Sequence, residues 1–244
     1  MPNNRYIDRP FVAAALALGA CIFITGIIFS FAFYSARQGN DTISVTGSAK
    51  TSVKANTAKW TIEVYRSAMQ EGLTAAYAAV GREATSVRQY FIDAGIPVED
   101  ITQTTATADQ DWSYNSNGGP TRYRVHQEIT IESSDVDKVQ GLAQSGALVA
   151  RGLSVSPRQP EYYISTLPEL RVELLGQAVA DAKARAAEIA KSGDASVGKL
   201  TSASSGVVQV MAPNSTSVED YGSYDTSTIE KEVSVTARAT FVVR

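Results

Sequence analysis

The feature that most restricts how this chain can fold is a run of 24 residues, 11–34, that contains no charged side chain. An α-helix needs about 20 apolar residues to cross a bilayer, whereas a cleaved export signal has an apolar region of about 7–15 residues and a small-x-small cleavage site. The clearest candidate for such a site, Ser30-Phe31-Ala32, lies inside the run itself. The sequence therefore favours a retained transmembrane helix, with a cleaved signal as the alternative.

Basic residues on the two sides of this run predict its orientation. Arg5 and Arg9 precede it, and Arg37 is the nearest basic residue after it. Because basic residues collect on the cytoplasmic side of a membrane, we expect a cytoplasmic N-terminus and a large domain outside the cytoplasm. The predicted division is a tail at 1–10, a transmembrane anchor at 11–34, a linker at 35–41 and an extracytoplasmic domain at 42–244.

The chain after the linker is rich in segments whose apolar and polar residues alternate. In one of them Trp60, Ile62 and Val64 alternate with polar neighbours, which is the period-2 pattern of a half-buried strand. The same pattern predicts strands at Ile43–Ala49, Ala58–Arg66, Arg122–Glu132 and Val233–Val243. The turn sequence SNGGP at 116–120 predicts a hairpin that joins a strand within 101–114 to the strand containing Tyr123.

Two long segments have apolar residues at three- and four-residue steps, the spacing of one helix face. The first face is Leu73, Tyr77, Val80, Ala84, Val87 and Phe91, with Gly95 as the C-cap. The second face is Val172, Leu175, Val179, Ala182, Ala186 and Ile189, with a capping box from Thr166 and Glu169 before it and Gly193 at its end. A short third helix is predicted at 135–146, with Ser134 as its N-cap.

The order of these elements predicts an α+β fold. Twice a strand leads into a long helix, a glycine and another strand, near Gly95 and near Gly193, which suggests an internal duplication. Asp181 and Arg185 lie four residues apart on the second helix and are expected to pair on its outer face. We therefore expect mixed, mainly antiparallel sheets covered by two long helices and one short helix, after the N-terminal transmembrane helix.

The composition argues against several classes of function. A formal net charge of −3 leaves no basic excess for binding nucleic acid. The single cysteine, Cys21, lies in the apolar run, and the single histidine, His126, is too few for common zinc sites. The sequence contains no nucleotide-binding, hydrolase or metalloprotease motif. We therefore expect no catalytic residue, cofactor or metal, and do not expect an enzyme.

Acidic side chains are the nearest approach to a catalytic pattern. Asp109 and Asp111 can share one strand face, and Glu99-Asp100 is an acidic pair at a turn. Paired carboxylates can transfer protons, but without a partner motif we interpret these, like His126, as solvated surface groups. A further acidic group lacks the spacing of a calcium loop: Glu219, Asp220 and Asp225.

The candidate contact residues are four aromatic side chains close to turns, Trp112, Tyr114, Tyr123 and Tyr221. They either pack locally or anchor a contact with a ligand or a protein, because Tyr and Trp are enriched in interfaces. Tyr221 lies in a long polar segment, 212–228, for which we favour a mobile loop or a subunit contact over a ligand lid.

Three stretches carry a resemblance to a known family. They are ISVTGSAKTSVKANTAKWTIEV at 43–64, Gly95-Ile96 followed by Asp100-Ile101-Thr102, and Gly198-Lys199-Leu200. In order and spacing they resemble the SIMPL-domain proteins, a group that includes bacterial periplasmic immunogens and oxidative-stress-related envelope proteins. Ala49 stands where the family's opening usually has a second glycine. The resemblance implies an α+β domain in the bacterial envelope, here on the inner membrane, a large ring- or cage-like homo-oligomer and a link to stress. It implies no catalytic residue.

Residues and resemblance together favour a structural or interaction protein. It would assemble with copies of itself as a scaffold or channel-like complex, contact the membrane through 11–34, and have an envelope protein of unknown identity as a further partner. Unpaired sheet edges at Ile43–Ala49 or at the C-terminal strand are expected to supply the contacts between subunits. The alternative is a binding module for a small ligand, lipid or envelope peptide, with a groove near Trp112–Tyr123 and the loop around Tyr221.

Overall fold

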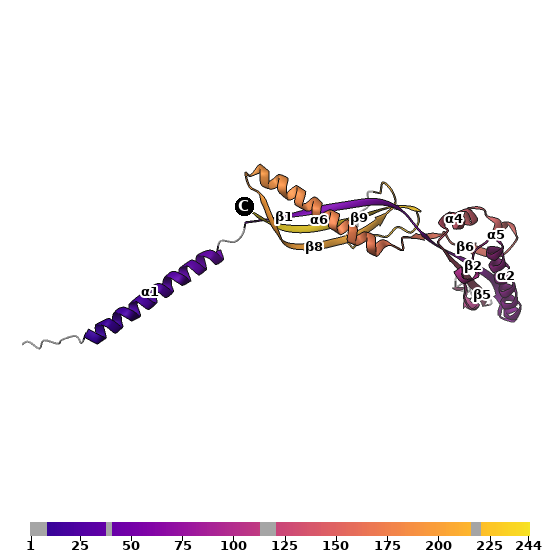
Figure 1. The fold of residues 1–244 in the computed structure, drawn as a ribbon. Coiled ribbons are helices and arrows are strands. Elements are labelled where there is room, and N and C mark those ends of the chain that lie inside the picture. The colour runs from indigo at the N-terminus through magenta and orange to yellow at the C-terminus, as the bar shows by residue number, and fades with distance from the viewer. Residues whose placement is uncertain (1–8, 38–40, 113–120, 216–220) are drawn as a thin grey trace, which may run out of the picture.

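The structure is a computed structural model that describes residues 9–37, 41–112, 121–215 and 221–244. Its first helix, α1 (Arg9–Arg37), extends away from the rest of the chain (Figure 1). The side chains of residues 13–34 are all exposed, and the segment Ala13–Tyr34 is long and apolar enough to cross a membrane. The predicted apolar helix in front of an α+β domain is confirmed.

The strands nearest α1 form a three-stranded antiparallel sheet, which we call the proximal sheet. Its order is β1-β9-β8, and the long helix α6 lies along one face (Figure 1). The bounds are β1 Thr42–Lys54, α6 Leu167–Ser192, β8 Val197–Met211 and β9 Glu230–Val243. The expectation that the C-terminal strand is a sheet edge is therefore wrong, because β9 pairs along both sides. The expectation that Ile43–Ala49 lies on an edge strand agrees with the order.

Helix α6 packs on the proximal sheet through small residues. Its buried positions are Leu174, Ala178, Ala182, Ala186 and Ala190. A Cβ atom on Gly47 of β1 would lie 2.1 Å from the backbone oxygen of Ala178, so the helix and the strand are in backbone contact there. The predicted face was partly wrong: Ala182 and Ala186 are buried, but Val172 and Ile189 are 73% and 55% exposed. The alanines face the sheet because only short side chains allow this close approach.

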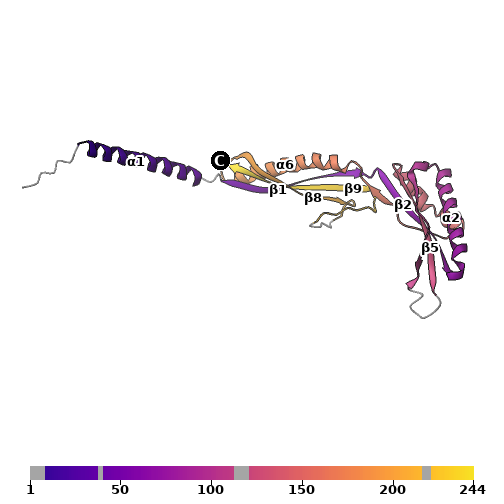
Figure 2. The same ribbon diagram turned by 90° about the horizontal axis from the view of Figure 1, so that it is seen from below.

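Residues 57–163 form a second, six-stranded antiparallel sheet, the distal sheet, which is inserted in the chain between β1 and α6. Its strands are β2 Thr57–Met69, β3 Ile101–Gln103, β4 Thr107–Gln110, β5 Arg122–Ser133, β6 Val155–Pro157 and β7 Glu161–Tyr163. Its helices are α2 Leu73–Asp93, α4 Val136–Gln144 and α5 Ala147–Ala150, with short 3-10 turns at Gln70–Gly72 and Val98–Asp100. Figure 2 shows α2 along one side of this sheet.

The core of the distal sheet follows the predicted patterns closely. Alternate residues of β2 and β5 are buried beneath α2, which presents most of the predicted face to them. One position differs: Tyr77, which was predicted on this face, is partly exposed, and its neighbour Ala76 is buried instead. The Trp60 ring meets Phe91 edge-on, with 5.5 Å between ring centroids. Such pairs contribute about 1 kcal/mol of stability beyond the hydrophobic contribution of the area that they bury. The α+β class and the mainly antiparallel sheets, covered by two long helices and short ones, are confirmed.

The predicted helix ends are confirmed in part. Gly95 follows α2 with a φ of 82°, a left-handed conformation that only glycine adopts easily. The short helix is capped by Asp135, whose carboxylate accepts a hydrogen bond from the amide of Lys138, and not by Ser134. Thr166 is the N-cap of α6, but its side chain makes no capping hydrogen bond, so the predicted capping box does not form. The predicted turn at 116–120 lies outside the described residues, while the β4–β5 pairing on either side of it is antiparallel, as a hairpin requires.

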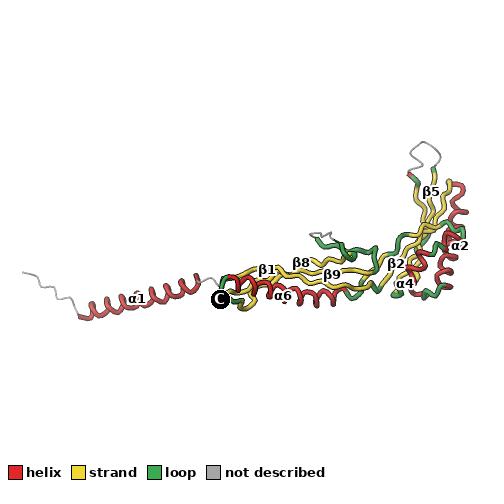
Figure 3. The backbone as a smooth tube through the Cα atoms, turned by 90° about the horizontal axis from the view of Figure 1, so that it is seen from above, coloured by secondary structure: helices red, strands yellow, loops and turns green. Residues whose placement is uncertain are grey.

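The two sheets follow one another along an elongated, bent body (Figure 3). The chain crosses between them twice, at residues 55–56 between β1 and β2 and at residues 164–166 between β7 and α6. Each sheet is covered by one long helix, which is the arrangement that a duplicated strand–helix–strand unit would give; the duplication itself stays a prediction.

Candidate functional site

A buried ion pair lies at the junction between the two sheets. Lys231 of β9 is fully buried, in phase with the core residues Val233 and Val235. Its Nζ donates a hydrogen bond to the backbone oxygen of Asp225 and lies 3.5 Å from the Oδ2 atom of the same residue. Because the amine has no exposed surface, it is a structural group and offers no nucleophile to a substrate.

Hydrogen bonds fix the charge of the acidic partner. The Oδ1 atom of Asp225 accepts from the Ser227 hydroxyl at 2.6 Å, and Oδ2 accepts from the amide and hydroxyl of Thr228. Burial acts to raise the pKa of Asp225, but these hydrogen bonds and the charge of Lys231 outweigh it and hold the pKa well below its ordinary value. Burial lowers the pKa of Lys231, and the Asp225 carboxylate opposes that change.

The segment that carries Asp225 joins the two sheets, and we call residues 222–229 the brace. Thr226 accepts a hydrogen bond from the amide of Tyr162 in β7, at 2.8 Å, and Ile229 accepts one from Ala55, at 2.9 Å. Tyr224 lies against the proximal strand β8 and stacks at a tilt on Tyr163. The brace is thus packed and hydrogen-bonded at both ends, while the mobile loop or subunit contact expected for 212–228 stays a prediction.

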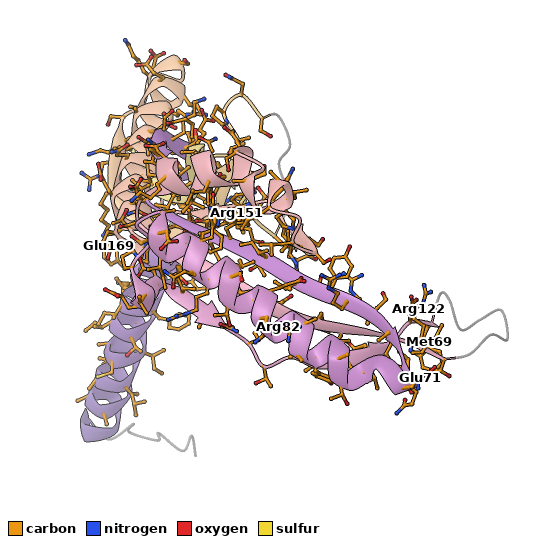
Figure 4. All side chains as sticks on the ribbon, turned by 90° about the vertical axis from the view of Figure 1, so that its right-hand side faces the viewer. Met69, Glu71, Arg82, Arg122, Arg151 and Glu169 are labelled. Atoms are coloured by element: carbon orange, nitrogen blue, oxygen red, sulfur yellow. The ribbon has the colours of Figure 1, made fainter. Side chains whose placement is uncertain are left out.

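The three aromatic candidates that the structure describes, Trp112, Tyr123 and Tyr221, do not come together at one site. Trp112 follows β4 and is 75% exposed. Tyr123 of β5 pairs with Gln110 of β4, so both aromatic residues lie at the far end of the distal sheet. Figure 4 shows Met69 and Arg122 at that end. Tyr221 is 97% exposed and immediately precedes Gly222, which packs against β8 of the proximal sheet. Tyr114 lies outside the described residues. The contact role of these residues, and the groove near Trp112–Tyr123 and the loop around Tyr221, stay predictions.

The acidic candidates make ordinary surface contacts. Asp109 of β4 lies 3.7 Å from the Nδ1 atom of His126, whose Nε2 atom lies 3.2 Å from the Thr107 hydroxyl. Glu99 and Asp100 form part of a 3-10 turn. Within the described ranges no three His, Cys, Asp or Glu side chains gather where they could hold a metal ion.

The outer edge of β1 is an exposed sheet edge. No strand described here pairs with this edge, and at Ser48 it is covered instead by α6: the Ser48 amide donates to Oδ2 of Asp181, at 2.8 Å. Asp181 also pairs with Arg185, at 2.9 Å, as the sequence predicted. The prediction that this pair lies on the outer face was wrong, because Asp181 reaches the sheet edge.

Beside the uncovered part of β1 lies an open groove, which we call the edge groove. Its volume is about 740 Å³, and its lining is formed by Val45, Thr46, Ala184, Arg185, Ala187, Glu188 and Ile189. The groove thus combines free backbone groups of a strand with small apolar side chains of a helix. Ile189, which the periodicity placed on the buried face of α6, instead lines this groove.

Comparison with known proteins places these features in a family. Residues 43–243 match the model of the family SIMPL, described as a protein of unknown function (DUF541). No curated protein matches the chain. The family match covers both sheets, the brace and α6, and it begins immediately after the first residue of β1.

Proposed function

Since the chain belongs to the SIMPL family, and α1 fits a membrane anchor, we propose that the protein is a single-pass protein of the bacterial inner membrane whose extracytoplasmic domain assembles into a symmetric homo-oligomer. The oligomer acts as a scaffold or channel-like complex on the membrane surface. A link to envelope stress is part of this proposal and is supported by the family resemblance alone.

One observation supports the assembly: in the described part of the chain, no strand pairs with the outer side of β1, and the outer side of β8 is paired only with the brace, at Val210. Unpaired strand edges present rows of free N–H and C=O groups that readily pair with another chain. Two different edges on one subunit allow head-to-tail contacts, which give a ring when the rotation closes and a filament when it does not. We therefore propose that β1 of one subunit pairs with β8 of the next.

The proposed membrane anchor, α1, favours a closed ring over a filament. Each subunit must enter the membrane from the same side, and a rotation axis perpendicular to the membrane satisfies this for every copy. The start of β1 lies next to the linker, and the C-terminal end of β9 lies beside it, since the amide of Val243 donates to the oxygen of Asp41. The proposed contact edges thus begin close to the membrane surface in every subunit.

The extent of each edge is limited by features already described. Asp181 covers β1 at Ser48, and the edge groove lies beside Val45 and Thr46, so we propose that residues 42–46 form the contact segment of that edge. On β8, the brace covers Val210, because the amide of Val210 donates to the oxygen of Ser223. Register irregularities also occur between Val197 and Val208 of this strand. Such features restrict edge pairing in natural sheets.

The test is the mass of the assembly, measured by light scattering on full-length protein in mild detergent and on a soluble form starting at Gln38. We expect both to be large and uniform. Ile189→Lys places a charge in the edge groove and is expected to reduce the mass, whereas Val172→Lys, an exposed position on the same helix that does not line the groove, is the matched control and should not. Monomeric wild-type protein, or an unchanged mass for Ile189→Lys, would overturn the proposed edge contact.

A further inference from the structure

A polar hollow on the distal sheet is separate from the edge groove. It lies where α4 meets the connection between β6 and β7, and its volume is about 370 Å³, within the range of about 300–1,000 Å³ found for small-molecule sites. Gln140 and Gln144 of α4 form one side of it, and Gln159 forms part of the other. Tyr162 of β7 also lines it.

The lining of the hollow is rich in hydrogen-bonding groups that carry no charge. The side-chain amides of Gln140 and Gln144 lie one helical turn apart, and each offers both donors and an acceptor. Within the described residues, neither these amides nor the Tyr162 hydroxyl has a hydrogen-bond partner. Burial raises the pKa of Tyr162, so its hydroxyl keeps its proton and can donate.

The one charged side chain in the hollow, Arg158, is paired with a carboxylate. Arg158 donates from Nη2 to Oε1 of Glu128 on strand β5, at 2.6 Å. Because Glu128 balances the charge of Arg158, the site has little net positive charge to favour a phosphate or carboxylate over a neutral ligand. Its hydrogen-bonding groups therefore fit a neutral ligand.

The hollow is also held in shape without a ligand. The backbone oxygen of Arg158 accepts a hydrogen bond from Nε1 of Trp60, at 2.7 Å. The backbone amide of Arg158 donates to the backbone oxygen of Thr61, at 3.0 Å. Tyr162 is fixed by the brace through Thr226. Because this backbone is already held, binding has to order only the glutamine side chains, which limits the conformational entropy lost.

We propose that this hollow binds a neutral, hydroxyl-rich ligand of the size of a mono- or disaccharide through Gln140, Gln144, Gln159 and Tyr162. Hydroxyl groups both donate and accept hydrogen bonds, as the amides opposite them do. A proline-rich peptide fits less well, since it needs exposed aromatic rings, and the rings of Trp60 and Tyr162 are only 3% and 5% exposed.

The extracytoplasmic location in the proposed function supplies the source of such a ligand, the sugar chains of the cell envelope, and to that extent this inference rests on it. The two are distinguishable by experiment. If the protein is a monomer that binds sugar, the proposed site is supported and the proposed assembly is contradicted. If it forms a ring that binds no sugar, the assembly is supported and the site is contradicted.

The experiment titrates full-length protein in mild detergent with chitobiose and with maltose, and follows binding by calorimetry and by saturation-transfer NMR. We expect saturable binding of at least one disaccharide and about tenfold weaker binding for Gln144→Ala. Gln177→Ala, an exposed glutamine on α6, is the matched control and should bind like the wild type. The proposal is overturned by an absence of saturable binding, by equal affinity in Gln144→Ala, or by tighter binding of inorganic phosphate or a polyproline peptide at the same site.

Discussion

The carboxylate of Asp181 on α6 accepts a hydrogen bond, 2.8 Å long, from the backbone amide of Ser48 on the outer edge of β1. This hydrogen bond and the pairing with Arg185 lower the pKa of Asp181. A side chain from the covering helix thus occupies a backbone donor that would otherwise be free to pair with another strand. The contact interrupts the exposed β1 edge at Ser48.

Replacing Asp181 with Ala should lengthen the exposed edge. Without the carboxylate, the Ser48 amide becomes available, and we expect heavier or less uniform assemblies, because free edge groups promote further pairing. Sedimentation velocity on the soluble form measures the distribution. Asp181→Asn keeps an acceptor oxygen and serves as the control. Identical distributions for Asp181→Ala and the wild type would show that Asp181 does not limit the edge.

Replacing Gly47 with Ala should destabilise the proximal sheet by about 3 kcal/mol. The new Cβ would lie 2.1 Å from the backbone oxygen of Ala178 and 2.4 Å from the amide nitrogen of Ala182, so α6 would have to move. Urea unfolding of the soluble form measures the change. Gly176→Ala is the opposite control: nothing lies within 4 Å of its Cβ position, and in a helix interior the change should stabilise by about 0.5–1 kcal/mol. If Gly47→Ala lowered the free energy of unfolding by no more than an ordinary surface substitution does, the close contact would be contradicted.

Replacing Lys231 with Met should weaken the link between the two sheets. The change leaves Asp225 without its buried cation, and removing one partner of such a pair costs about 3 kcal/mol. Because the brace contacts both sheets, we expect thermal unfolding to separate into two transitions, which calorimetry would resolve. Lys50→Met removes an exposed ion pair with Glu232 and should leave a single transition close to that of the wild type.

Acid should destabilise the junction through Asp225. The pKa of this carboxyl is lower in the folded protein than its unfolded value of about 3.9. Its contribution to stability is therefore complete above about pH 4 and is lost as the pH falls from there towards the folded pKa. Urea midpoints measured from pH 7 to pH 3 should fall over the last unit, and Asp225→Asn should show a smaller fall. An equal acid dependence in the two proteins would assign the effect to other carboxyls.

Local patterns in the sequence predicted most of the elements but not their neighbours in space. Alternation identified the strands because burial on one face is a local property of each strand. The position of β9 in the middle of its sheet was missed, since strand order depends on contacts between segments far apart in the chain. Lys231 carried a usable signal, because it stands two residues before Val233 in the buried phase of the strand.

The error in α6 has a physical cause. Periodicity weighted the large apolar residues Val172 and Ile189, whereas the sheet is contacted by alanines that permit a closer approach. Gly47 on the facing strand is the complementary signal, and it could have identified the buried face. Trp112 follows strand β4 of the distal sheet, whereas Tyr221 precedes Gly222, which contacts β8 of the proximal sheet, and no local pattern reveals this separation.

The direct passage from β1 into β2 has a mechanical consequence. Only residues 55 and 56 separate these two strands, so the chain runs from the linker to the far end of the distal sheet in an almost continuously extended form. An extended backbone has little slack, since its length is already near the maximum per residue. Tension applied between the linker and the end of β2 at Met69 would therefore load the covalent chain of β1 and β2 directly, before any loop could extend.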